Sequence, residues 1–235
     1  MPRHTRILSE NKIYHIVLKG INSNDIFLSD NDYKLFLKYF KEACVDYNVE
    51  IIAYCLMSNH VHFILKFSNE HMAEMFKSFG AKYVPKYNYI HSKTGPLFNG
   101  RYYSSPINDD EYLFAVLRYI HYNPVSAGIS REPGDYSRSS YNDYIYHNNS
   151  ITDISFIESL LSDSEFEALH IVDDNILDEF FIMNSKVNGI KQKEIVDFVE
   201  VHKNLSQEEM IELLQKAGAT KSIIASVLNI SRKRL

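Results

Sequence analysis

Residues 49–67, VEIIAYCLMSNHVHFILKF, contain two apolar runs joined by a short polar turn. Val49 to Met57 and His60 to Phe67 are rich in β-branched and aromatic residues, while Ser58-Asn59 supplies turn chemistry. The stretch therefore predicts a β-hairpin. Because side chains alternate across a strand, His60 and His62 are expected on the same face of the second strand.

The flanking sequence predicts further strands and helices on both sides of this hairpin. Residues 13–21 indicate a strand, and residues 32–47 repeat apolar positions at helical spacing. Residues 71–87 indicate another helix, interrupted at Gly80 and Pro85, and residues 102–107 a short strand. Asp109-Asp110 favours the start of a third helix, which Pro124 is expected to end at about Asn123. The order β-α-β-β-α-β-α predicts an α+β fold, with a ferredoxin-like antiparallel sheet and packed helices.

Charge divides the chain into three parts, and we expect one domain over 1–148, a linker over 149–204 and a C-terminal segment over 205–235. The net charge is −5. Residues 151–204 hold 4 Lys and Arg against 12 Asp and Glu, whereas residues 1–150 hold 16 against 15. The acidity therefore belongs to a helical linker region, and a nearly neutral first domain can still present a basic face to a phosphate backbone.

Several classes of protein are not indicated. No apolar run approaches the roughly 18 residues that a membrane span requires, and the N-terminus lacks the apolar core of a signal peptide. Cys44 and Cys55 are the only cysteines and form no CxxC pair, so neither a zinc knuckle nor a disulfide framework is predicted. We expect a cytoplasmic protein.

The residues with the clearest chemical potential are two histidines, a tyrosine and an asparagine. His60 and His62 can converge on one divalent ion, although a His-x-His pair alone is a weak signal. Tyr119 and Asn123 are four positions apart, so both lie on one face of the third helix. Two imidazoles and an amide oxygen leave open coordination positions for phosphate oxygens and water, which suits Mg²⁺ or Mn²⁺ better than zinc.

Three motifs in this order resemble a known family. Residues 53–62, AYCLMSNHVH, look like the His-hydrophobic-His motif of single-tyrosine transposases. Residues 95–102, GPLFNGRY, and residues 119–125, YIHYNPV, look like two further signatures of that family. The nearest subgroup is the REP-associated tyrosine transposases, relatives of the insertion-sequence-200 enzymes of bacteria, and the resemblance covers roughly residues 8–145.

The resemblance implies an enzyme that binds, cleaves and rejoins single-stranded DNA at hairpin-forming sequences. His60, His62 and Asn123 would hold Mg²⁺ or Mn²⁺ against the scissile phosphate, and Tyr119 would attack to give a 5′-phosphotyrosine. Tyr122 and Tyr112 are alternative nucleophiles, although Tyr112 is better explained by packing.

Other residues near these motifs have competing roles. His15, on the first strand, can approach the metal, but a structural role is the simpler interpretation. His121 lies on the opposite side of its helix from Tyr119 and is interpreted as structural.

Candidate DNA contacts are spread along the chain. Arg101 is a candidate phosphate contact, and Arg3, Arg6 and Lys19 are candidates for a basic rim. Tyr102, with its neighbour Tyr103, is a candidate for stacking on unpaired bases. Residues 220–231 resemble the middle of a helix-turn-helix, after which Arg232 and Arg234 would contact phosphates.

Two other functions stay open on the sequence. One is a domesticated protein that recognises hairpin DNA without mobilising it, and the other is a metal-dependent phosphoesterase that uses water. The subgroup is expected to work as a monomer, whereas some relatives build a composite site across a dimer.

Overall fold

The computed structural model describes residues 9–69, 71–148, 151–171, 206–216 and 221–231. The chain divides into two units, Met1–His170 and Ile171–Leu235. The predicted contacts Arg3, Arg6, Arg232 and Arg234 lie outside the described residues. In the part of the chain that is described, no helix is both long enough and apolar enough to cross a membrane.

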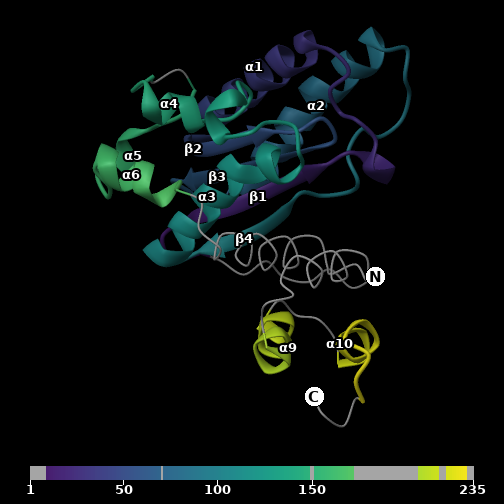
Figure 1. Cartoon of the computed structure of the whole chain (residues 1–235). Coiled ribbons are helices and arrows are strands. Elements are labelled where there is room, and N and C mark those ends of the chain that lie inside the picture. The colour runs from purple at the N-terminus through teal and green to yellow at the C-terminus, as the bar shows by residue number, and fades with distance from the viewer. Residues whose placement is uncertain (1–8, 70, 149–150, 172–205, 217–220, 232–235) are drawn as a thin grey trace. The chain divides into compact units, whose positions relative to one another are not determined.

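The first unit is built on a four-stranded antiparallel sheet (Figure 1). Its strands are β1 (Ile13–Lys19), β2 (Val49–Leu56), β3 (His60–Phe67) and β4 (Tyr103–Ile107), in the order β2-β3-β1-β4. Strands β2 and β3 form the predicted hairpin, with a register shift between Ile51 and Ala53. This strand order is that of the ferredoxin-like fold, so the predicted fold class is confirmed.

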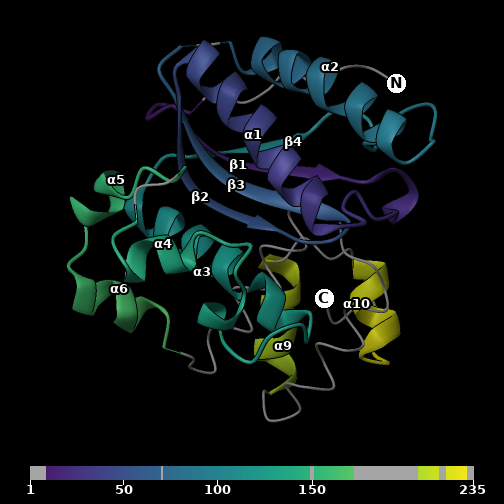
Figure 2. The ribbon, with the colours of Figure 1, turned by 90° about the horizontal axis from the view of Figure 1, so that it is seen from above.

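Helices α1 (Asp30–Tyr47) and α2 (Met72–Ile90) pack against each other and cover one face of the sheet (Figure 2). A capping box between Ser29 and Asp32 starts α1. The core beneath the two helices is aromatic: Phe36 and Phe40 of α1 lie on Phe63 of β3, with the ring centroids of Phe40 and Phe63 4.2 Å apart. Burial of these rings is the main force that holds the helices to the sheet.

Helix α3 (Asp110–Ser126) contacts the opposite face of the sheet, beside the short helix α4 (Tyr141–Ile145) (Figure 2). The carboxylate of Asp109 accepts a hydrogen bond of 2.7 Å from the backbone N–H of Tyr112 and so caps the helix as predicted. This face of the sheet is formed by alternate residues of each strand, among them His15, His60 and His62. The two faces therefore differ: one is an aromatic core and the other carries histidines.

Two predicted helix boundaries are wrong. Helix α2 continues through Gly80 and Pro85, and α3 passes Asn123 and Pro124 to end at Ser126. Proline removes one helical hydrogen bond and strains the preceding turn. In α2, burial of Tyr87 beyond Pro85 offsets that loss, whereas α3 ends two residues after Pro124.

The first unit extends to His170, beyond the predicted boundary at 148. Helices α5 (Ser155–Glu158) and α6 (Asp163–Leu169) belong to it. The side chain of His170 bonds to that of His121 in α3, and Phe166 packs against Tyr144 at 4.8 Å between ring centroids. These buried contacts between α3, α4 and α6 make residues 151–170 part of the first domain, although their composition is that of an acidic linker.

The outer backbone edges of the two border strands, β2 and β4, differ in what covers them. Along β2, backbone groups of Arg138, Ser140 and Asp153 bond to those of Leu56, Tyr54 and Ile51, at 2.8–2.9 Å. Within the described residues strand β4 pairs with β1 alone, and it carries Pro106 in its interior. Short 3-10 turns at Ile21–Ser23 and Pro133–Asp135 complete the connections.

The described part of the second unit consists of helices α9 (Gln207–Lys216) and α10 (Lys221–Val227). A capping box starts α9, because Glu209 and Ser206 exchange backbone-to-side-chain bonds of 2.8 and 3.3 Å. Asn229, within the stretch 220–231 that resembles a helix-turn-helix, has a positive φ of 52°, which asparagine adopts more readily than most residues. The helix-turn-helix stays a prediction, since its second helix would begin beyond the described residues.

Candidate active site

The histidine face of the sheet is organised by strand register. Residue pairs opposite each other in antiparallel strands share a face, and His60 lies opposite Lys19 while His62 lies opposite Val17. His15, two positions before Val17, therefore faces the same side. His15 and His62 are fully buried, with 0% and 1% of their surface exposed, whereas His60 is half-buried. The predicted His60/His62 pair is thus part of a cluster of three imidazoles.

Helix α3 adds Tyr119 and Asn123 to this cluster. The two residues are one helical turn apart, as predicted, and Asn123 Oδ1 lies 3.3 Å from His60 Nε2. The ring of Tyr119 meets that of His62 edge to face, with centroids 5.3 Å apart and planes at 88°. Four predicted residues from two elements therefore meet within one chain. Tyr119 is 2% exposed.

The two polar contacts of the His60 ring define a place for a cation. Its Nδ1 lies 2.6 Å from Asn59 Oδ1 and its Nε2 3.3 Å from Asn123 Oδ1. A neutral imidazole has one N–H, which serves the shorter contact, so Nε2 carries a lone pair that faces another acceptor. Two ligands of one octahedral Mg²⁺ lie roughly 3 Å apart. The residues present therefore fit a divalent metal between His60 Nε2 and Asn123 Oδ1.

The protonation states of the histidines also suit a metal. Burial lowers the pKa of His60 to about 4, and burial lowers the pKa of His62 well below its usual range. Both rings are then neutral at pH 7, the form that binds metals. Among the described residues no group of three or more His, Cys, Asp and Glu is arranged to hold a metal. The candidate set is therefore two imidazoles and the amide oxygen of Asn123.

His15 does not complete the set as a third ligand. Its Nε2 lies 3.1 Å from Nδ1 of His62, so this ring supports a candidate ligand. Burial lowers the pKa of His15 to about 3. In the sequence, the alternation of His15 with Val17 and Lys19 on one strand predicts that these three residues share a face. It does not predict the contact of His15 with His62, which depends on the pairing of β1 with β3.

His121, interpreted as structural, lies in a buried chain of hydrogen bonds on the side of α3 away from Asn123. Its Nδ1 is 2.9 Å from His170 Nε2, and its Nε2 is 2.9 Å from Ser140 Oγ. The neighbouring Tyr122 donates to the His170 carbonyl oxygen at 2.5 Å. Tyr122, an alternative nucleophile, therefore points toward α6, away from the histidine face.

The predicted DNA contacts are divided between the two sides of the sheet. Lys19 lies opposite His60 on the histidine face, at the end of β1. The ring of Tyr102 stacks on Phe76 of α2 at 3.9 Å between centroids, on the aromatic side. Tyr103, opposite Val17, is the neighbour that shares the histidine face. Tyr102 is thus a packing residue in this structure, and Tyr103 is better placed to meet DNA at the site.

Arg101 is exposed beside a largely apolar cavity of about 350 Å³ between α2 and the loop before β4. Lys77, also exposed, lies at the same cavity. Neither cation makes an ion pair within the described ranges. The loop before β4 reaches the end of β1 that lies beside His60, because the Asn99 N–H donates to the carbonyl of Lys19 at 2.8 Å. Arg101 is therefore an exposed cation, and its phosphate contact stays a prediction.

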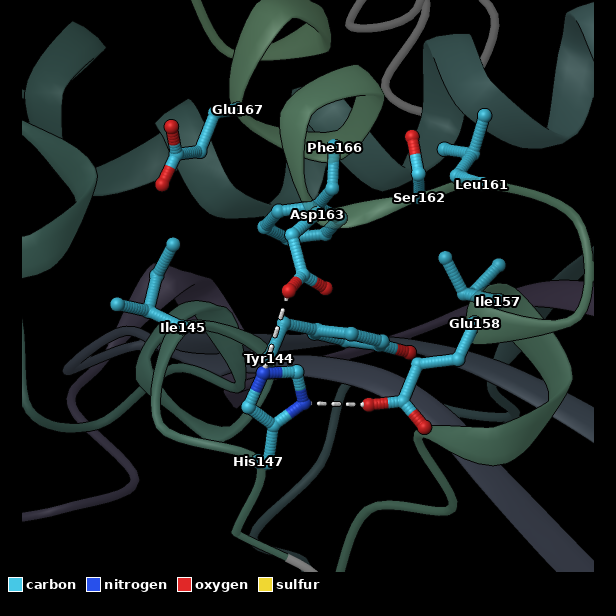
Figure 3. Close-up of a pocket in the computed structure, with 10 residues that line it drawn as sticks. All are labelled: Tyr144, Ile145, His147, Ile157, Glu158, Leu161, Ser162, Asp163, Phe166 and Glu167. Carbon is cyan, nitrogen blue, oxygen red and sulfur yellow. Dashed lines mark hydrogen bonds and ion pairs between the residues drawn. The ribbon is translucent and has the colours of Figure 1, made fainter.

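A separate cavity of about 70 Å³ lies between α4 and α6 (Figure 3). His147 stands at its mouth and contacts Glu158 at 2.8 Å through Nδ1 and Asp163 at 3.6 Å through Nε2. The two carboxylates raise the pKa of His147 above its usual value. Because they occupy opposite nitrogens of the ring, the three groups cannot share one cation, and we interpret this cluster as an ion-pair network.

Comparisons with known proteins agree with this geometry. The family described as "Transposase IS200 like" matches residues 9–123. A Haemophilus influenzae protein described as a REP-associated tyrosine transposase is 23% identical over 154 residues, which are 60% of this chain and 86% of that protein.

A solved structure shares the fold. It is a REP-associated tyrosine transposase bound to a REP hairpin, with 14% identity and a TM-score of 0.55 over 74% of this chain and 93% of that one. The family match spans β1 to Asn123 and so includes both histidines of β3 and the Tyr119 helix. Residues 9–123 of this chain are therefore similar to the IS200-like transposase family, and the predicted resemblance to REP-associated tyrosine transposases is confirmed.

Proposed function

We propose that this protein is a metal-dependent enzyme that cleaves and rejoins single-stranded DNA at hairpin-forming sequences, with Tyr119 as nucleophile. The observation that carries the proposal is the meeting of Tyr119, His62, His60 and Asn123 within one chain. Each of these side chains has a distinct chemical use in phosphoryl transfer. Hairpin DNA as the partner is supported by the fold shared with a transposase that was solved on a REP hairpin.

The proposed reaction exchanges one phosphoester bond for another. The Tyr119 oxygen attacks the scissile phosphorus and loses its proton, while the bond from phosphorus to the 3′ oxygen breaks. The departing oxygen takes up a proton and becomes a free 3′-OH, and the 5′ phosphate stays on Tyr119. Attack by a 3′-OH on this phosphotyrosine reverses the exchange and rejoins the strands without ATP.

The protein supplies the positions of the reacting groups. His60 and Asn123 approach each other as acceptors, and with His62 they are the residues proposed to hold Mg²⁺ or Mn²⁺. When bound, such a cation polarises the phosphate and favours the phenolate form of a nearby tyrosine. Lys19, opposite His60 in the sheet, adds positive charge on the same face. We propose that one chain carries a complete site and acts as a monomer.

A covalent adduct tests the nucleophile. Incubation with a single-stranded hairpin oligonucleotide and Mn²⁺ is expected to yield a protein–DNA species that survives denaturing electrophoresis. Tyr119→Phe should abolish it, while Tyr112→Phe, on the same helix, should retain it. Adduct formation by Tyr119→Phe at the wild-type level would refute the assignment. Product that never passes through a protein-linked form would indicate a phosphoesterase that uses water.

One observation favours a second candidate, a domesticated protein that binds hairpin DNA without cleaving it. Tyr119 is 2% exposed, so its ring must become accessible before it can meet a phosphate. Hairpin binding with no adduct across Mg²⁺, Mn²⁺ and Co²⁺ would support that function. An adduct in any of the three metals would exclude it.

A further inference from the structure

His15 of β1 is a buried polar residue that contacts the candidate ligand His62. The proposed reaction gives His15 no role. His15 is 0% exposed, and its Nε2 lies 3.1 Å from His62 Nδ1. The two ring planes are inclined by 22°. The rings of His15 and Tyr119 also pack edge to face, with their centroids 5.9 Å apart and their planes at 74°. His15 therefore contacts both His62 and Tyr119.

The contact between His15 and His62 allows one proton between two nitrogens. If His15 Nε2 holds it, the neutral His62 ring must carry its own proton on Nε2 and has no lone pair there for a metal. If His62 Nδ1 holds it, His62 Nε2 is unprotonated and His15 accepts. The metal-binding form of His62 therefore requires His15 to be the acceptor.

We propose that His15 is a positioning residue that accepts the Nδ1 proton of His62 and thereby presents His62 Nε2 to the cation. This inference rests on the proposed metal-dependent function. Ligating histidines commonly donate their other N–H to a fixed acceptor, which sets the tautomer and the ring orientation. Here the acceptor is a second imidazole, held on a neighbouring strand at a fixed register.

This arrangement also determines which nitrogen of His15 carries its proton. When His15 Nε2 accepts, its proton must lie on Nδ1, and that atom is buried without a hydrogen-bond partner among the described residues. Burial of an unpaired N–H disfavours this tautomer unless something compensates. Cation binding at His62 Nε2 provides that compensation. The tautomers of His15 and His62 should therefore change together when the metal binds.

Mn²⁺ binding to the full chain, measured by titration calorimetry without DNA, tests the role of His15. His15→Leu removes the acceptor and should weaken binding by about 10- to 100-fold. His15→Gln keeps an oxygen near the position of Nε2 and should stay within about threefold of wild type. His91→Leu, which removes a half-buried partner of the buried Asp32 on the other side of the sheet, is the matched control and should bind normally. Thermal unfolding of every variant verifies that it is folded.

Two results would overturn the proposal. One is wild-type Mn²⁺ affinity in His15→Leu, and the other is a His15→Gln variant that binds no better than His15→Leu. If wild type binds Mn²⁺ in a manner lost in His60→Ala but forms no DNA adduct, the proposed reaction fails while the role of His15 stands. Absence of Mn²⁺ binding in wild type would refute both.

A spectroscopic measurement reads the tautomer without any activity. Ring ¹⁵N shifts of His62 in ¹⁵N-labelled protein distinguish a protonated Nδ1 from a protonated Nε2. With saturating Mg²⁺ we expect the Nδ1–H form in wild type and in His15→Gln, and a mixture or the Nε2–H form in His15→Leu. A protonated His62 Nε2 in Mg²⁺-saturated wild type would overturn the proposal even if the affinities followed the expected order.

Discussion

His60 Nε2 and Asn123 Oδ1 lie 3.3 Å apart, although the residues are 63 positions apart in the sequence. The Asn59 side chain holds the other nitrogen of His60 at 2.6 Å. His60 is therefore held by its own turn at Nδ1, while its Nε2 faces the amide oxygen of α3. Any change in how α3 sits on the sheet must alter the distance between these two atoms.

Removal of the amide oxygen should weaken metal binding. Asn123→Ala is expected to reduce Mn²⁺ affinity and cleavage rate by on the order of 100-fold, because the cation loses one of three proposed protein ligands. Asn123→Asp should retain or increase the affinity, since a carboxylate oxygen is a stronger ligand for a hard cation. Asn142→Ala, which removes an amide bonded to the Gly134 carbonyl, is the control and should leave the affinity unchanged. Equal affinities in Asn123→Ala and wild type would refute the ligand assignment.

The first unit should lose stability in mild acid. Burial lowers the pKa of His170 to about 4 and lowers the pKa of His121 well below its usual range, while both residues titrate near 6.5 when unfolded. The unfolded chain therefore takes up protons first, so this contribution is full above pH 6.5 and is lost as pH falls to 4. His170 alone should account for on the order of 2–3 kcal/mol, as measured by urea unfolding across this range. His170→Gln should show a shallower decline, and a stability that is flat between pH 7 and 4 would contradict the explanation.

The exposed cations beside the 350 Å³ cavity should contribute to DNA affinity. Lys77→Glu and Arg101→Glu are each expected to weaken binding of a single-stranded hairpin oligonucleotide. Loss of a phosphate contact should also reduce the slope of log affinity against log salt concentration by about one per cation. Lys38→Glu, an exposed residue of α1, is the control. Fluorescence anisotropy at several salt concentrations measures both quantities, and an unchanged slope in Arg101→Glu would exclude a phosphate contact there.

The aromatic core between the sheet and helices α1 and α2 should contribute strongly to the stability of the first unit. Phe63 is 0% exposed and stacks on Phe40 at 4.2 Å between centroids. Phe63→Ala should cost about 3–5 kcal/mol of unfolding free energy, because it removes a large buried ring and leaves a cavity. Leu28→Ala, at a side chain that is 51% exposed, should change stability by less than about 0.5 kcal/mol. Denaturant unfolding of both variants at pH 7 makes the comparison.

Sequence reasoning predicted the parts of the site that depend on local spacing. The β2–β3 hairpin follows from two apolar runs and a polar turn, and its alternation puts His60 and His62 on one face. The Tyr119 and Asn123 pair follows from helical periodicity in the same way. The register between β1 and β3 depends on contacts between residues that are distant in the sequence. The pattern of either strand alone therefore could not predict the contact between His15 and His62.

Composition was a poorer guide to the limits of the domain and of its helices. Residues 151–170 are acidic, yet His170 and Phe166 are buried against α3 and α4. A few buried contacts decide where a domain ends, and net charge is insensitive to them. The same applies to Pro85, whose local effect on α2 is outweighed by the burial of Tyr87 that follows it.

The unequal protection of the outer strands bears on how copies of this protein can associate. The outer backbone of β2 is already bonded to Arg138, Ser140 and Asp153, and β4 carries Pro106, which offers no N–H to an incoming chain. Among the described residues, each border of the sheet therefore has a feature that opposes the addition of a further strand. Growth of the sheet from one molecule to the next is thereby disfavoured, which should reduce aggregation of the protein through its strands.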